Sequence, residues 1–246
     1  MSQLVLLAPP ESKPTFGKHV RDDARHAHLL GQACRLRGQA YVSDGAIPES
    51  DLNDRGEFYL PIDDQSWHIL IVGDHSEVVS AVRLTELPLS IRARRGRIPH
   101  IRSSLSRSSD HIDRLWEAER FLAFSAVRSG RSRPNFFVAS GWASREAQGA
   151  EVALAAWALT RRSNCSSALA IASERHDAYR QLMRTGAKPI RPASEGTLYY
   201  DPHYGCKVAL LGFMVFNEAD RLKRIVTRMA DGLDSTPVVM RESPLV

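Results

Sequence analysis

The sequence predicts a mixed α/β (α+β) fold in which helices cover both faces of a central sheet. Two strand-like runs, Trp67–Val72 and Val78–Leu84, flank a short polar turn, a pattern typical of a β-hairpin. Farther along the chain, amphipathic and apolar stretches alternate in the order helix, strand, helix, strand. A hairpin followed by such alternating units favours a mixed sheet between helices.

The front of the chain combines an extended segment with one long helix. Residues 1–18 contain Pro9, Pro10 and Pro14, which predict an extended N-terminal tail. Residues 19–42 place apolar side chains at helical spacing without an internal proline and therefore predict a helix. We expect residues 19–218 to form a single domain.

The rear of the chain supplies the remaining elements. Residues 87–113 are rich in Arg and Ser and predict a long loop. The clearest helix is Arg145–Arg162, with Ser144 as its N-cap. The other predicted elements are, in order, a strand at 116–125, a strand at 168–172, a helix from Ser173 to Arg184 stopped by Gly186, a strand at 207–215, and a C-terminal helix and tail at 219–246.

Composition excludes several classes of protein. Hydrophobic residues make up 43% of the 246 residues and charged residues 25%, which excludes a wholly disordered, collagen-like or coiled-coil chain. No apolar run is long enough to span a membrane, and the N-terminus lacks the pattern of a signal peptide. We therefore expect a cytoplasmic protein with no integral membrane association.

Cysteine and histidine give no metal or disulfide pattern. Cys34, Cys165 and Cys206 are too few and too scattered for a disulfide framework or a zinc site, and we expect them to be buried as small apolar groups. His26 and His28 diverge on a helix, which argues against a shared metal ion. A cysteine nucleophile stays open as an alternative, although no local motif supports it.

Charge is distributed unevenly along the chain. Residues 41–90 contain ten acidic and two basic residues, whereas residues 91–107 contain six arginines and no acid. The arginine-rich segment suits an acidic partner, or it is an ordinary solvated surface. No aromatic residues interleave with these arginines, so we do not expect nucleic-acid binding.

Four short motifs occur in a fixed order. They are Arg37 four residues before Tyr41, the pair Asp51 and Asp54, the dipeptide Arg83-Leu84 in the hairpin, and the run Trp116-Glu117-Ala-Glu119-Arg120-Phe121. Each is weak alone, but the ordered set resembles the autoinducer-synthase group, which comprises acyl-homoserine-lactone synthases and the related N-acyl amino acid synthases.

The resemblance implies the fold of the Gcn5-related N-acyltransferases, with a mostly antiparallel central sheet. The segment Gly141–Ala150 lacks the pyrophosphate-binding loop of acetyl-CoA-using members of that fold. Autoinducer synthases usually lack this loop too, because they usually take the acyl group from acyl carrier protein. The resemblance therefore implies an acyl-carrier-protein partner, or acyl-CoA as donor, a small amine or amino acid as acceptor, and no bound cofactor.

The resemblance also implies roles for individual residues. Glu117 matches the carboxylate proposed as the base, and Arg83 and Arg120 match arginines that order the acidic cluster and the substrate. Asp51 and Asp54 match an acidic pair that holds an ammonium group or fixes a loop through Arg37. Other candidate substrate-binding residues are Tyr41 and Glu119, and candidate carrier-docking residues are Arg92, Arg94, Arg95, Arg97, Arg161 and Arg162.

Other interpretations stay open for these residues and for the activity. Asp51 and Asp54 also suit turns, and Arg83 also suits a structural ion pair within an apolar strand. Glu119 stands where lactone synthases usually carry Ser or Thr, which favours an amino acid acceptor over homoserine lactone synthesis. A lactone synthase, a CoA-dependent acyltransferase and a non-catalytic binding module are the alternatives.

Overall fold

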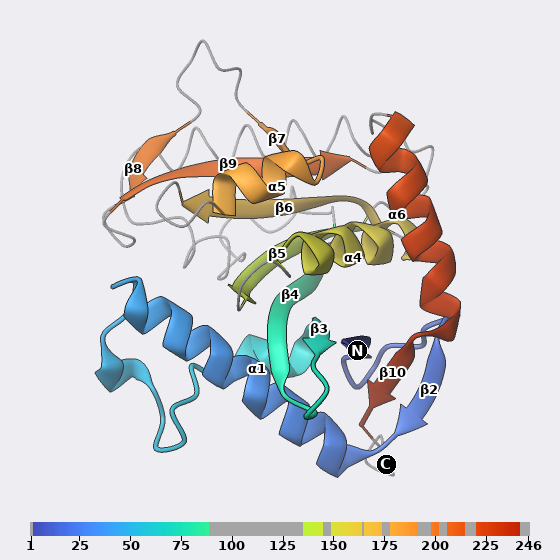
Figure 1. Ribbon diagram of the computed structural model, residues 1–246, viewed down its shortest axis with the longest axis horizontal. Helices are drawn as coiled ribbons and strands as arrows, with labels where there is room; N and C mark the ends of the chain where they lie inside the picture. Colours follow the sequence, from blue (N-terminus) through green and yellow to red (C-terminus); the bar gives the residue numbers. More distant parts are fainter. Residues whose placement is uncertain are drawn as a thin grey trace. The chain divides into compact units, whose positions relative to one another are not determined.

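The computed structural model describes residues 2–88, 135–144, 149–163, 165–173, 178–190, 198–201, 206–214 and 220–241. The chain divides into two compact units (Figure 1). The first unit comprises residues 1–85, 139–159 and 225–246, and the second comprises residues 86–138 and 160–224. Each unit is described by itself.

The first unit is built on a mixed set of strands. Their order is β2-β10-β1-β3-β4-β5, with β1–β3 and β3–β4 antiparallel and β1–β10 and β10–β2 parallel. The strands are β1 (Gln3–Leu7), β2 (Lys18–Arg21), β3 (Trp67–Val72), β4 (Val78–Pro88), β10 (Pro237–Met240) and the greater part of β5 (Asn135–Ser144). The helical elements are α1 (Asp23–Ser43), η1 (Glu49–Asp51), η2 (Pro61–Gln65), η6 (Leu233–Ser235) and most of α4 (Gly149–Arg162) and α6 (Asp220–Gly232).

Helix α1 begins and ends at residues suited to those positions. The Asp22 carboxylate accepts a hydrogen bond of 2.8 Å from the Arg25 backbone N–H, which caps the N-terminus of the helix. Gly45, with a φ of +68°, follows the last turn. Leu29, Leu30 and Ala33 recur at helical spacing and bury one face of the helix.

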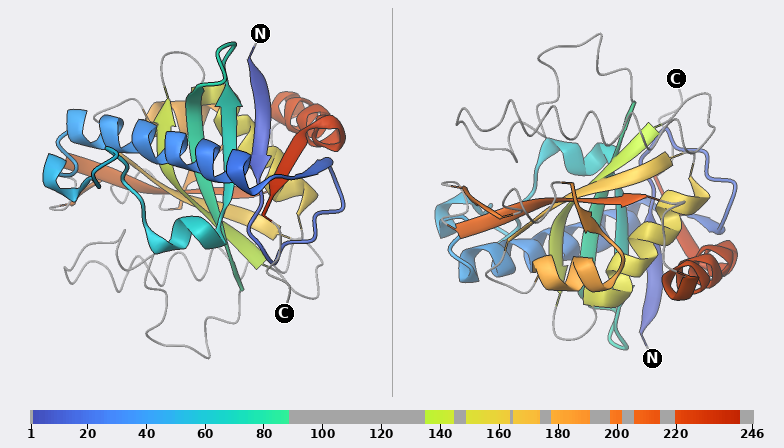
Figure 2. Two further views of the ribbon diagram at one scale, coloured as in Figure 1. Left: turned by 90° about the horizontal axis from the view of Figure 1, so that it is seen from below. Right: turned by 90° about the horizontal axis from the view of Figure 1, so that it is seen from above.

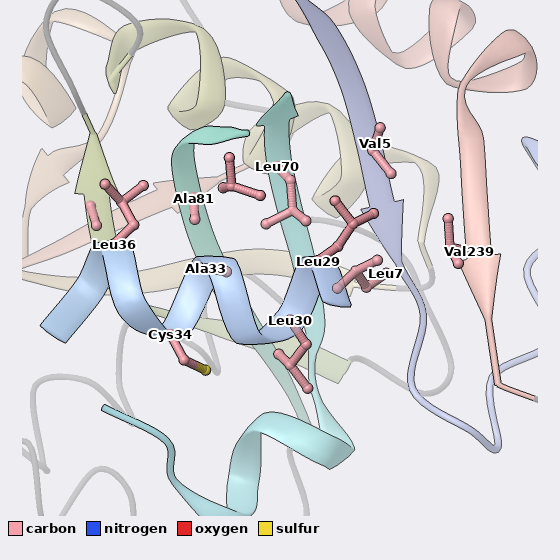
Figure 3. Packing of buried hydrophobic residues seen from close by; sticks show 12 residues of the cluster. Val5, Leu7, Leu29, Leu30, Ala33, Cys34, Leu36, Leu70, Ala81 and Val239 are labelled. Atoms are coloured by element: carbon pink, nitrogen blue, oxygen red, sulfur yellow. The ribbon is translucent and has the colours of Figure 1, made fainter. Parts of the chain in front are cut away.

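That face packs on the strands of the first unit (Figure 3). Leu29, Ala33 and Cys34 of α1 belong to one buried cluster with Val5 of β1 and Leu70 of β3. Helix α1 covers one face of these strands, and α4 lies on the opposite face (Figure 2). Helices on both faces of the strands were predicted from the sequence and are confirmed.

The strands that pair with β9 (Cys206–Met214) in the second unit are all antiparallel to it. They are β6 (Cys165–Ser173), β7 (Lys188–Pro189) and β8 (Tyr199–Asp201). Helix α5 (Ala178–Arg184) packs against β6 and β9. The predicted hairpin, the helix–strand–helix–strand order and the mostly antiparallel pairing are therefore found.

Both ends of the chain differ from the prediction. The expected N-terminal tail contains β1, where Val5, Leu6 and Leu7 are fully buried and pair with β3 and β10. The expected helix start at residue 19 is wrong, because residues 18–21 form β2 and α1 begins at Asp23. The expected C-terminal tail contains β10. Short strands completed by distant partners carry too little local pattern to be recognised.

Two expectations around β5 also change. Ser144 is the last residue of β5, and α4 begins at Gly149, so Ser144 is not adjacent to the helix. Strand β5 itself was not predicted, because its small residues Ala139–Gly141 interrupt the apolar alternation that marks a strand. The predicted strand at 116–125 lies outside the described residues.

The burial of β1 leads to a stability prediction. We expect Leu6→Ala to lower the free energy of unfolding by about 2–5 kcal/mol, because the fully buried side chain leaves a cavity. Gln3→Ala, at an exposed position of the same strand, should change it by less than about 0.5 kcal/mol. Urea denaturation measures both variants, and an equal effect would contradict the buried position of β1.

Candidate functional site

A buried carboxylate joins two arginines from different elements of the first unit. Asp63, on η2, is 1% exposed. Its Oδ1 accepts hydrogen bonds from Arg37 Nη1 at 2.9 Å and from Arg83 Nη1 at 3.0 Å, and its Oδ2 accepts one from Arg37 Nη2 at 2.7 Å. We call Arg37, Asp63 and Arg83 the arginine–aspartate cluster.

The backbone around η2 fixes the position of Asp63. Pro61 starts η2, where a missing N–H and a fixed φ are tolerated. Asp63 Oδ2 accepts a hydrogen bond of 2.8 Å from the Leu60 backbone N–H, and Ser66 Oγ donates to the Ile62 carbonyl at 2.7 Å. The carboxylate is therefore held by its own turn as well as by the arginines.

Arg37 is buried in the last turns of α1. Its Nε donates to the Phe58 carbonyl at 3.1 Å, its Nη2 donates to the same oxygen, and its guanidinium lies 5.7 Å from the Phe58 ring centroid. Nη2 also contacts Cys34 Sγ at 3.4 Å. This environment places a fixed charge on the buried face of α1.

Arg83 lies on β4 and contacts β5. Its Nε and Nη2 donate to Ser140 Oγ at 3.1 and 3.0 Å. These contacts and the bond to Asp63 use three of its five N–H groups. Gly141, which follows Ser140 on β5, has a φ of +66°, and a Cβ there would lie 2.9 Å from Arg37 Nη1. Glycine thus allows β5 to approach the cluster closely.

The cluster controls the ionisation of its own acid. Burial alone would raise the pKa of Asp63, but hydrogen bonds from Arg37 and the charges of Arg37 and Arg83 outweigh it and lower the pKa to about 2. His68, on β3, has its pKa lowered to about 4 because burial disfavours the imidazolium. The neutral ring donates from Nε2 to the Asp63 carbonyl at 2.9 Å.

These states leave the cluster with an excess of positive charge. Near neutral pH it contains two guanidinium groups and one carboxylate, while His68 is uncharged. Arg37 is 3% and Arg83 8% exposed. Because a buried charge is costly without a partner, the cluster favours the approach of an anion.

The structure brings together only some of the predicted site residues. Arg37 and Arg83 meet at Asp63. Tyr41, one turn after Arg37, is half-buried, and its ring lies 5.8 Å from that of Phe58. Burial raises the pKa of Tyr41, which keeps the phenol neutral. Glu117, Glu119 and Arg120 lie outside the described residues.

The predicted acidic pair does not partner Arg37. Asp51, at the end of η1, and Asp54 are both exposed, and the carboxylate on Arg37 is Asp63. The prediction that the pair fixes a loop through Arg37 is therefore wrong. Two exposed acids in a turn-rich segment stay solvated, whereas a buried guanidinium needs a buried acid.

The candidate carrier-docking residues are described only in part. Arg161 and Arg162 end α4 in the second unit, where Arg161 is half-buried and Arg162 is exposed. Arg92, Arg94, Arg95 and Arg97 lie outside the described residues. Carrier docking therefore stays a prediction.

Sequence reasoning missed Asp63, His68, Ser140 and Gly141. One signal was available for the acid: Arg37 and Arg83 both lie in apolar patterns, so each needed a buried anion. Asp63 lies four residues before the first strand of the hairpin, between the two arginines in the sequence. No local pattern marks Ser140 or Gly141.

The three cysteines are buried, as predicted, and none of them forms a disulfide. Burial raises the pKa of the Cys34 thiol to about 12, so the nucleophilic thiolate is suppressed. Within the described ranges, no three His, Cys, Asp or Glu side chains group in a way that suits a metal ion. No described helix is long and apolar enough to cross a membrane.

Solved structures provide the comparison that decides the fold. TofI, solved in a ternary complex with an inhibitor and MTA, has a TM-score of 0.53 and 14% sequence identity, with 89% of this chain and 95% of that chain covered. The chain has the fold of TofI. The predicted fold class is therefore confirmed, and the resemblance to the autoinducer-synthase group holds at the level of the fold.

Two further solved structures have lower scores. BjaI, a CoA-dependent acyl-homoserine lactone synthase solved with SAM and isopentyl-CoA, has a TM-score of 0.48 at 15% identity, covering 93% of this chain and 94% of that chain. Arylalkylamine N-acetyltransferase 2 from Aedes aegypti has a TM-score of 0.47 at 7% identity, covering 76% and 95%. No family model and no curated protein matches the sequence.

The buried imidazole of His68 predicts acid-dependent stability. Its pKa is about 4 in the folded chain and 6.5 in the absence of burial, so the unfolded chain binds the proton at higher pH. The free energy of unfolding should therefore fall by about 3 kcal/mol as the pH drops from about 6.5 to about 4. Urea denaturation across this range should show the fall in the wild type and a smaller one in His68→Gln. Equal slopes would contradict a neutral buried imidazole.

The approach of β5 to Arg37 predicts a difference between two glycines. Gly141 and Gly45 have φ values of +66° and +68°, but a Cβ at Gly45 meets nothing within 4 Å. Gly45→Ala should lower the free energy of unfolding by about 1 kcal/mol through backbone strain alone. Gly141→Ala should cost about 1–3 kcal/mol more, because Arg37 must move. Thermal and urea denaturation compare the two variants, and equal losses would show that Arg37 is not confined by β5.

Proposed function

We propose that this protein is an N-acyltransferase. It moves a fatty acyl group from an acyl-carrier-protein thioester to the α-amine of an amino acid or a homoserine-type acceptor, in the cytoplasm. Two independent lines support the proposal: the TofI-like fold, and the ordered motifs that resemble the autoinducer-synthase group.

The arginine–aspartate cluster is the observation that carries the proposal. Arg37 and Arg83 come from two of the four motifs, and they share one buried carboxylate. The cluster holds one positive charge in excess, and Arg83 keeps two N–H groups beyond its described contacts. A carboxylate of the acceptor, or that of Glu117, matches this charge and these donors.

The acyl-transfer reaction requires three contributions from the protein. The acceptor must be oriented, its ammonium must lose a proton, and the developing oxyanion must be stabilised. The nitrogen then attacks the thioester carbonyl, the N–C bond forms, the C–S bond breaks, and the thiol leaves with a proton. We assign orientation to Arg37 and Arg83 through Asp63, and proton removal to Glu117. Backbone N–H groups supply the oxyanion contacts.

The acyl donor and the acceptor define the alternatives. A carrier protein is acidic and would suit the arginines of residues 91–107 together with Arg161 and Arg162. The ordered motifs that resemble the autoinducer-synthase group make an acyl-homoserine-lactone synthase the second candidate. The extra carboxylate of Glu119 favours an amino acid instead.

Product analysis tests the proposal. We expect mass spectrometry of extracts from expressing cells to reveal an acyl amide whose mass identifies the acyl chain and the amine together. Arg83→Ala and Glu117→Ala should lower its yield at least about 100-fold while the fold is retained, since both residues act on the acceptor. Arg55→Ala is the matched control. It removes an exposed basic side chain from the acidic segment 41–90, which also contains Arg83, and it should keep full yield.

Purified enzyme then separates the alternatives. Acyl-carrier-protein and acyl-CoA thioesters are compared as donors, and a panel of amino acids is compared with S-adenosylmethionine as acceptor. Full activity of both Arg83→Ala and Glu117→Ala would reject the assigned roles. A folded wild type that transfers no acyl group in any combination would reject the N-acyltransferase itself.

A further inference from the structure

Arg241, the first residue after β10, joins three segments of the first unit. Its Nη2 donates to Asp64 Oδ1 at 2.5 Å, and its Nε donates to His26 Nδ1 at 3.3 Å. Asp64 belongs to η2 and His26 to the first turn of α1. One guanidinium thus contacts two of the three elements that hold the arginine–aspartate cluster, α1 and η2.

The two neighbouring acids of η2 have different surroundings. The Asp63 side chain is fully buried against Arg37 and Arg83, whereas that of Asp64 is 37% exposed and pairs with Arg241. Successive residues on a 3₁₀ helix differ by about 120° around the axis, which sends the two carboxylates in different directions. Asp64 also accepts a hydrogen bond from the Tyr59 hydroxyl. A rotation of η2 would therefore move both acids together.

Arg241 extends from a rigid base. Val238 and Val239 of β10 are fully buried, and β10 pairs with both β1 and β2. The Asp22 backbone N–H donates to the Met240 carbonyl at 3.2 Å, which ties the end of β10 to the N-cap of α1. His26 is 3% exposed, so its ring is also held in place. The backbone from which the Arg241 side chain extends is therefore held in place.

We propose that Arg241 is a positioning residue: through Asp64 it sets the orientation of η2 and hence the place of Asp63 between Arg37 and Arg83. For its effect on activity, this inference rests on the proposed function. The effect on η2 itself does not depend on that function. The C-terminal strand thereby contributes to a site whose other members lie within the first third and the middle of the chain.

Hydrogen exchange of the full chain tests the link without any substrate. Arg241→Ala should speed exchange of the backbone amides of residues 60–68 at least about threefold, because η2 loses the ion pair between Arg241 and Asp64. Arg35→Ala is the matched control. It breaks the 3.1 Å pair between Glu57 and an arginine of exposure similar to that of Arg241, and exchange of residues 60–68 should be unchanged. Unchanged exchange of these amides in Arg241→Ala would overturn the proposal.

Coupling and kinetics separate positioning from a general loss of stability. Arg241→Ala and Asp64→Asn should be non-additive, so that the double variant exchanges no faster than the more affected single variant. Additive effects would show that Arg241 does not act through Asp64. In the active enzyme, Arg241→Ala should raise the KM for the acceptor about fivefold and leave the KM for the acyl donor unchanged. An equal change in both constants would overturn the positioning role, whereas an inactive wild type would reject only the proposed function.

Discussion

The carboxylate of Asp63 is the constraint on which the site of this protein depends. Two guanidinium groups approach it from α1 and β4, and neither is tolerable in the interior without an anion. Removal of the acid would leave two uncompensated buried charges, whereas removal of one arginine would leave a complete pair. The cluster is therefore more sensitive to the loss of its one acid than to the loss of either base.

The surrounding elements hold the Asp63 carboxylate between the two guanidinium groups. The short helix η2 turns Asp63 inward, His68 holds its carbonyl, and Gly141 lets β5 approach the guanidinium of Arg37. Asp63 and His68 are both weak bases, because the pKa of Asp63 is about 2 and that of His68 about 4, and both side chains are buried. Under the proposed function they orient charge, which is how preorganised sites favour a transition state.

Pairing between segments far apart in the sequence explains why β1 and β10, near the two ends of the chain, are part of the sheet. β1 and β10 pair with each other in the first unit, and Arg241 extends the influence of β10 to η2. A single exposed ion pair contributes little to global stability. Its consequence is local, because it selects one orientation for a short helix that carries the buried acid. The ion pair between Arg241 and Asp64 thus affects the orientation of η2 more than it affects the stability of the whole fold.

The sequence by itself determined the central helix and the hairpin, whereas only the resemblance to a known family implied that Arg37 and Arg83 belong to one site. Helical and strand periodicities depend only on neighbouring residues, so they can be read from the sequence. An arginine within an apolar pattern likewise indicates that a buried anion must lie beside it. Tertiary structure alone decided that the partner is Asp63 rather than Asp51 or Asp54, because burial depends on distant strands. It also decided the strand character of both termini, since a four- or five-residue strand is stabilised by its neighbours and not by its own residues.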